Sequence, residues 1–70
     1  MAEQNDVAKL YGEFEEALVD VLTAEGELFF SRRRKLRLAR TRLRAHKDFT
    51  QPEYEAVVLR AEARAWEILG

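Results

Sequence analysis

The apolar positions of this chain repeat every three or four residues in three separate stretches, which is the spacing of one face of a helix. In the first stretch they are Val7, Leu10, Tyr11, Phe14, Ala17, Leu18, Val21 and Leu22. Asn5 or Asp6 can cap the start of this stretch, and Gly26 is a natural end. We therefore predict a helix over about residues 5–24 with one broad apolar face.

The last stretch begins with the clearest start signal. Thr50-Gln51-Pro52-Glu53 has the form of a capping box, in which Thr50 caps the helix and Glu53 reaches back to it. Pro52 falls in the first turn, where a missing N–H costs nothing. Helical spacing continues through Tyr54, Val57, Val58, Ala61, Ala65, Ile68 and Leu69. These features predict a helix over about residues 52–69.

The middle stretch allows two interpretations. Its apolar residues Leu28, Phe29, Leu36, Ala39 and Leu43 share one narrow face. Ser31 can cap a helix that begins after it, which leaves Leu28-Phe29-Phe30 in a loop. A longer helix over about residues 28–47 includes these three residues, and we favour it because three exposed apolar loop residues would stabilise nothing.

Together the stretches predict an all-α, up-down-up three-helix bundle, or a long helical hairpin with a third helix, as one domain over residues 1–70. Seventy residues leave no room for two domains, and the absence of Cys excludes disulfide scaffolds and Cys-based zinc modules. So small a core rarely supplies more than ~3–5 kcal/mol. Leu59, Ala63 and Trp66 form a second apolar stripe on the last helix, so we expect a homodimer that buries this stripe as its interface.

A net charge of −1 hides a segregated charge pattern. Residues 1–27 hold eight acids and only Lys9 as a base, residues 28–47 hold nine bases and no acid, and residues 48–70 hold five acids and two bases. The order of the helices is therefore acidic, Arg-rich, acidic. We expect Glu–Arg pairs between them along the flanks of the core, which would help to fix the order of the helices.

The Arg-rich helix carries a candidate site for a polyanion. Its stripe consists of Arg33, Arg37, Arg40 and Arg44 over about 16 Å of helix, with Arg34 and Lys47 at the edges. Arginine binds phosphate in a bidentate manner, and neutralised phosphates supply much of the affinity for nucleic acids. We expect contact with the DNA or RNA backbone without sequence readout, because no Asn or Gln lies on that face. The exposed glutamates of the last helix would repel phosphates, so that helix is not the expected contact.

Other interpretations of the same residues stay open. The acids of the flanking helices can already occupy the arginines, and the acidic first helix can itself imitate nucleic acid. The protein can also be a regulator or inhibitor that binds an acidic protein partner, with Leu59 and Trp66 as apolar anchors and the arginines as steering charges. A structural subunit of a larger assembly is a further possibility, and a small chain of this kind suits a phage or mobile element.

The sequence carries no pattern typical of an enzyme. His46, the only histidine, lies near Asp48 at the predicted end of the Arg-rich helix, where its charge would suit the helix dipole. Phosphate loops, dinucleotide fingerprints and paired Glu-x-x-His motifs are absent. We expect no catalysis, no metal or cofactor and no small-molecule substrate. No apolar run is long enough to span a membrane, and the acidic start predicts no signal peptide, so we expect a cytoplasmic location.

Overall fold

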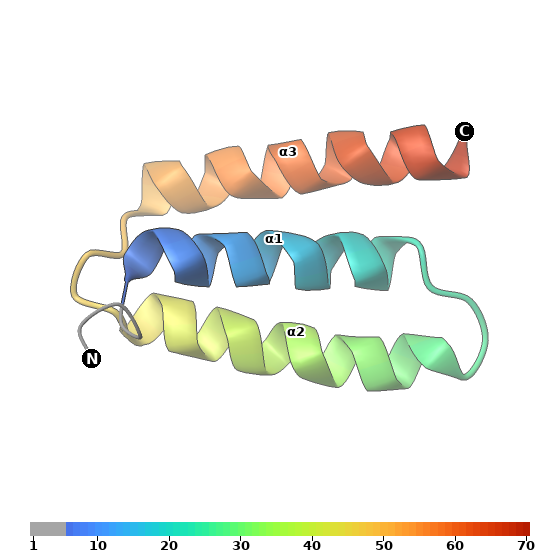
Figure 1. Ribbon diagram of the computed structural model, residues 1–70, viewed down its shortest axis with the longest axis horizontal. Coiled ribbons are helices and arrows are strands. Elements are labelled where there is room, and N and C mark those ends of the chain that lie inside the picture. Colours follow the sequence, from blue (N-terminus) through green and yellow to red (C-terminus); the bar gives the residue numbers. More distant parts are fainter. Residues whose placement is uncertain (1–5) are drawn as a thin grey trace.

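The structure, a computed structural model, describes residues 6–70, and this part of the chain contains three α-helices. Helix α1 spans Val7–Leu22, α2 spans Leu28–Ala45 and α3 spans Gln51–Leu69. The predicted all-α class is confirmed. Helices α1 and α3 run in one direction and α2 runs in the opposite direction (Figure 1).

Helix α1 lies between the other two helices (Figure 1). It packs against α2 on one side and against α3 on the other, whereas no Cα atom of α2 lies within 8 Å of one in α3 within residues 6–70. The bundle is therefore open, because α1 makes the close backbone contacts with both outer helices. Each outer helix keeps a wide surface in contact with solvent.

The main buried cluster lies near the connection between α2 and α3. It consists of Tyr11, Phe14, Leu43 and Val57. The Tyr54 ring covers this cluster, with its centroid 5.0 Å from that of Phe14 and 5.6 Å from that of Phe49. All three helices contribute to the cluster, so aromatic and aliphatic side chains join α2 to α3 at this end without close backbone contact.

Apolar side chains stay exposed at the opposite end, where α1 ends and α2 begins. Helix α2 includes Leu28, Phe29 and Phe30, so the structure has the longer of the two predicted helices. The longer helix does not bury all three of these side chains, because Leu28 and Phe30 are exposed and only Phe29 is half-buried. The helix ends at Ala45, two residues before the predicted end.

The helix ends differ from the predicted signals in two places. Thr50 occupies the N-cap position of α3, but its side chain forms no capping hydrogen bond, so the predicted capping box is wrong. Gly26 does not end α1, because the C-cap is Thr23. Gly26 instead adopts a φ of 60° in the turn before α2, a conformation that glycine reaches without steric cost.

The start of α1 and the start of α3 are held by two different side chains. The Asp6 carboxylate caps α1 by accepting a hydrogen bond from the Ala8 N–H at 2.9 Å, whereas Asn5 lies outside the described residues. At α3, the Thr50 N–H donates to Tyr11 Oη at 3.0 Å, and the same hydroxyl donates to the Thr50 carbonyl at 3.1 Å. A single tyrosine of α1 thus satisfies both backbone groups of the residue that precedes α3.

Replacement of Tyr11 by Phe tests this connection. We expect Tyr11→Phe to lower the free energy of unfolding by about 1 kcal/mol, because two hydrogen bonds are lost while the ring stays in the core. Urea unfolding followed by circular dichroism measures the change. Tyr54→Phe is the control, since the Tyr54 hydroxyl has no hydrogen-bond partner within residues 6–70. An equal loss in both variants would contradict the assigned role of Tyr11.

Candidate functional site

Several arginines of α2 lie along one flank of the helix, beside the apolar residues that face α1. Leu36 and Ala39 pack against the main buried cluster, which also contains Leu43. At about 100° per residue, Arg33 and Arg40 lie next to this apolar face, and Arg37 lies further round on the same flank. The helical period therefore turns a run of basic sequence into a stripe with a defined direction.

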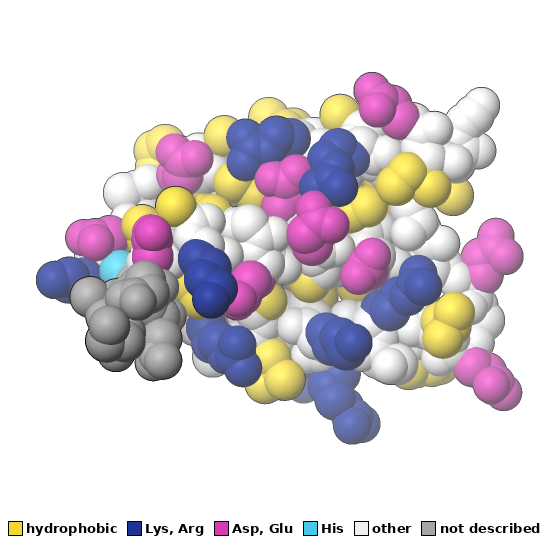
Figure 2. Space-filling model, in the orientation of Figure 1, with side chains coloured by type: hydrophobic (Ala, Val, Ile, Leu, Met, Phe, Trp, Pro, Cys, Tyr) yellow, Lys and Arg dark blue, Asp and Glu magenta, His cyan; other side chains and the backbone are white. Residues whose placement is uncertain are grey.

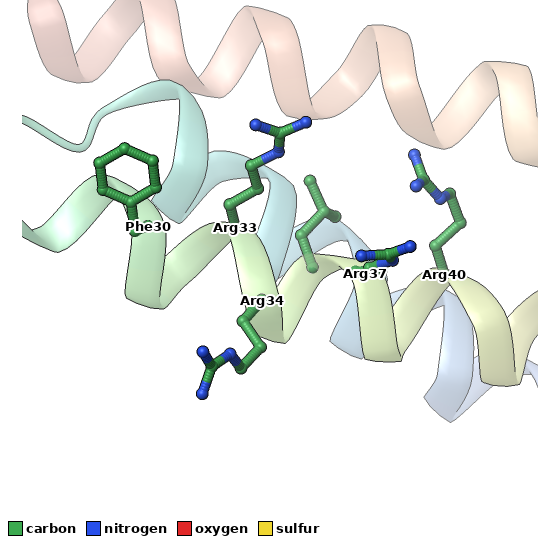
Figure 3. A pocket seen from close by; sticks show the side chains of 6 residues that line it. Phe30, Arg33, Arg34, Arg37 and Arg40 are labelled. Atoms are coloured by element: carbon green, nitrogen blue, oxygen red, sulfur yellow. The ribbon is translucent and has the colours of Figure 1, made fainter.

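This flank of α2 contains a shallow concavity. Its lining consists of Phe30, Arg33, Arg34, Leu36, Arg37 and Arg40. In Figure 3, Phe30, Arg33 and Arg40 extend toward the side on which α3 lies, whereas Arg34 points away from them. The structure therefore brings together three of the predicted arginines, with Arg34 at the margin, and adds the ring of Phe30, which the sequence prediction did not include.

The arginines of the concavity have no acidic partner among residues 6–70. Within residues 6–70, no ion pair or hydrogen bond involves the side chains of Arg33, Arg34, Arg37 or Arg40. Their neighbour Arg32 donates to the Asp20 backbone carbonyl at 3.2 Å, not to a carboxylate. The expectation that Glu–Arg pairs would join α2 to the flanking helices is therefore wrong for the described residues.

Acids of α1 pair with arginines of α3 instead. Arg60 Nε donates to Glu15 Oε1 at 2.8 Å, and Arg64 Nη1 donates to Glu15 Oε2 at 2.7 Å and to Glu16 Oε2 at 2.6 Å. The Glu15 side chain is only 12% exposed. Hydrogen bonds from Arg64 and then Arg60 hold the pKa of Glu15 below its ordinary value, and those to Glu16 and Glu15 raise the pKa of Arg64.

Figure 2 shows the result on one face of the molecule, where bases and acids alternate over α1 and α3 and further bases gather along α2. The net charge of residues 48–70 does not indicate this pairing, because five acids outnumber the two arginines. The spacing of the two arginines of α3 does indicate that they can act together. Arg60 and Arg64 are four residues apart, which places them on the same side of α3.

The remaining predicted arginine and lysine lie beyond the concavity. The guanidinium carbon of Arg44 lies 5.9 Å from the ring centroids of both Phe49 and Tyr54. These cation–π contacts place Arg44 at the rim of the core, although its side chain remains exposed. Lys47 lies in the turn after α2 and is also exposed. Both charges extend the basic surface toward the connection with α3.

The residues predicted as an interface lie on the outer face of α3. Trp66 is 74% exposed and Leu59 is 66% exposed, and Ala63 between them is exposed as well. Trp66 also lines a concavity with Leu22 and Leu69, which lie at the open end of the bundle. The apolar surface of α3 is therefore continuous with the end at which the helices leave apolar side chains uncovered.

His46 lies at the C-cap of α2, close to the predicted position. The Asp48 N–H donates to His46 Nδ1 at 3.0 Å, and the nearest carboxylate oxygen of Asp48 is 4.0 Å from the same nitrogen. Within residues 6–70 no group of three or more His, Cys, Asp or Glu residues is arranged to hold a metal ion. None of the helices described combines the length and the apolar character that crossing a membrane requires.

Comparison with known proteins gave no match. No family model, no curated protein and no solved structure is significantly similar to this chain. Inferences about function therefore depend on the surface chemistry of the three helices.

The pKa of Glu15 predicts how stability depends on pH. Because this pKa is lower in the folded state than its ordinary value of 4.5, the ionised carboxylate stabilises the fold above that value. The contribution is lost as the pH falls through the folded-state pKa. We expect the free energy of unfolding to decrease less in Glu15→Gln than in the wild type between about pH 6 and about pH 3, measured by urea titration.

Glu13→Gln is the matched control for this prediction. Glu13 is an exposed acid of α1 that has no ion pair within residues 6–70. Its replacement should leave the pH dependence of the wild type in place. If Glu15→Gln also retained the full pH dependence, the arginines of α3 would not be the groups that stabilise α1 against α3.

Proposed function

We propose that this protein is a small, non-catalytic nucleic-acid-binding protein that contacts the phosphate backbone of DNA or RNA through α2. The supporting observation is that Arg33, Arg37 and Arg40 share one concavity and have no acidic partner within residues 6–70. Binding of a polyanion there breaks no ion pair of the described chain. It releases the counterions that the phosphates hold, which is the main source of such affinity.

The chemistry of the stripe suits phosphate better than a general anion. A planar guanidinium donates two parallel hydrogen bonds to phosphate oxygens, which an ammonium group does not. The arginines from Arg33 to Arg44 follow the helix axis for about 16 Å, so they match an extended chain of charges. No Asn or Gln accompanies them on this flank, which supports backbone contact without sequence readout.

The acids of the protein restrict the direction of approach. Helix α3 exposes four carboxylates, those of Glu53, Glu55, Glu62 and Glu67. These charges would repel phosphates over the outer surface of α3. A nucleic acid is therefore expected to lie over the flank of α2 that contains the concavity, whereas Lys35 and Arg42 lie on the other flank.

Charge reversal within the concavity tests the proposed function. Fluorescence anisotropy with labelled duplex DNA and single-stranded RNA should show binding by the wild type that weakens steeply with salt. We expect the double variant Arg37→Glu/Arg40→Glu to bind at least about tenfold more weakly at low salt. Its log–log salt slope should be reduced by about 2, because two phosphate contacts are lost.

The control is Lys35→Glu/Arg42→Glu, which changes the charge of the same helix by the same amount outside the concavity. It should retain most of the affinity. Equal losses in both double variants would mean that only net charge matters. If the wild type did not bind any nucleic acid at low salt, the proposed function would be wrong.

The outer face of α3 supports a second function, which is assembly with a second copy or another protein. Exposed Trp66 and Leu59 lie on this face, and Trp is enriched among residues that dominate protein interfaces. The small core gives such a chain a reason to bury more apolar surface by association. In this second proposal the protein is a regulator, an inhibitor or a structural subunit, and the arginines steer it toward an acidic partner.

Sedimentation velocity tests the second function. We expect the wild type to sediment as a dimer at micromolar concentration and Trp66→Ala to sediment as a monomer, because truncation of a central aromatic anchor costs about 2 kcal/mol or more. Leu38→Ala removes an exposed apolar side chain of α2 and should leave the dimer intact. A monomeric wild type would contradict association through α3 with a second copy.

A further inference from the structure

An exposed aromatic ring lies at one end of the arginine concavity. Phe30 is 73% exposed and lines the same concavity as Arg33, Arg37 and Arg40 (Figure 3). The neighbouring Phe29 ring is half-buried and packs nearly perpendicular to the Phe30 ring, with centroids 5.7 Å apart and an interplanar angle of 82°. Phe29 thus packs against Phe30, and the Phe30 ring remains in contact with solvent.

The fold does not account for the position of Phe30. The ring belongs neither to the main buried cluster nor to the half-buried side chains packed against it. An exposed phenylalanine adds no charge to the stripe and offers nothing to a phosphate. A nucleic-acid duplex would therefore gain little from the Phe30 ring, because the bases of a duplex are stacked inside the double helix. An unpaired strand differs in this respect, because its bases are free to stack on an aromatic side chain.

We infer that the concavity of α2 selects single-stranded nucleic acid, with a base stacked on Phe30 and the adjoining phosphates bound by Arg33, Arg37 and Arg40. This inference rests on the proposed function and adds the class of nucleic acid. The combination of a basic groove with an aromatic stacking surface is what sequence-tolerant binding of single strands requires. The absence of Asn and Gln from this flank agrees with such tolerance.

The dimensions of the concavity agree with a short segment of strand. Phe30 and Arg40 are ten residues apart, which corresponds to about 15 Å along a helix. A strand with stacked bases carries about four phosphates over that length, since each nucleotide adds about 3.4 Å. Leu36 lines the concavity between these residues and is half-buried, so it offers an apolar contact for a sugar or the edge of a base.

Removal of the ring tests the inference directly. The probes are a labelled oligo-dT strand and a labelled mixed-sequence duplex of the same length, titrated by fluorescence anisotropy at one low salt concentration. The wild type should bind the single strand more tightly than the duplex. Phe30→Ala should weaken binding of oligo-dT by about 5- to 150-fold, the range of about 1–3 kcal/mol measured for one stacked base, and should change duplex binding less than about twofold.

Two further variants separate stacking from general loss of apolar surface. Leu38→Ala shortens an exposed apolar side chain of α2 that does not line the concavity, so its affinity for oligo-dT should stay at the wild-type level. Phe30→Trp in a Trp66→Phe background retains an aromatic ring and becomes the only tryptophan. Its fluorescence should be quenched by saturating oligo-dT and not by the duplex. Circular dichroism of each variant establishes that the helices remain folded.

The outcomes distinguish failure of the inference from failure of the proposed function. If the wild type bound neither probe at low salt, both would be overturned. If it bound both probes and Phe30→Ala had no effect, or weakened both equally, the selection of single strands would be wrong while backbone contact by α2 stood. Absence of quenching in the Phe30→Trp variant would also overturn stacking at this position.

Discussion

The carboxylate of Glu15 accepts hydrogen bonds from both arginines of α3. Because Glu15 pairs with α3 and not with α2, this interaction determines which bases of the described residues remain without acidic partners. Glu15 is the least exposed of the carboxylates in the observed ion pairs, so it is the one whose pairing matters most to the fold. Because α3 supplies its own bases to α1, the arginines of α2 are not needed there. Although the net charge of the chain is only −1, the described residues 6–70 therefore leave the arginines on one flank of α2 without acidic partners.

The open arrangement of the helices also depends on α1, which packs between α2 and α3. With α1 in the middle, α2 and α3 make no close backbone contact within residues 6–70, and both contribute to the core at one end through Leu43, Val57 and the aromatic rings. The other end has no comparable cluster, and Leu22, Phe30 and Trp66 remain exposed around it. Val19, Ala61 and Ala65 are buried outside the main cluster, but the large exposed apolar side chains are concentrated toward the end where α1 meets α2.

Much of the fold could be predicted because helical periodicity is local. Three helices, the cap at Asp6 and the flank shared by Arg33, Arg37 and Arg40 follow from spacing along the chain. The rest depends on contacts between residues far apart in sequence. Tyr11 replaced the predicted capping box at Thr50, and Arg60 and Arg64 replaced the predicted partners of the acids of α1. Phe30 lies in the longer predicted helix, but helical periodicity does not reveal which side of that helix packs against a neighbour, and its ring is exposed.

The Tyr11–Thr50 contact and the Glu15–Arg64 pair both join residues that are far apart in the sequence. The partners of the first contact are 39 residues apart, so it cannot form before Thr50 has been synthesised. Those of the second are 49 residues apart, and it cannot form before most of α3 has been synthesised. Until then, the bases available to the α1 carboxylates are Lys9 of the same helix and the bases of α2. On the ribosome, synthesis of the last helix therefore does more than complete the core. It gives Glu15 and Glu16 of α1 their arginine partners, so that these two acids do not engage the arginines of α2.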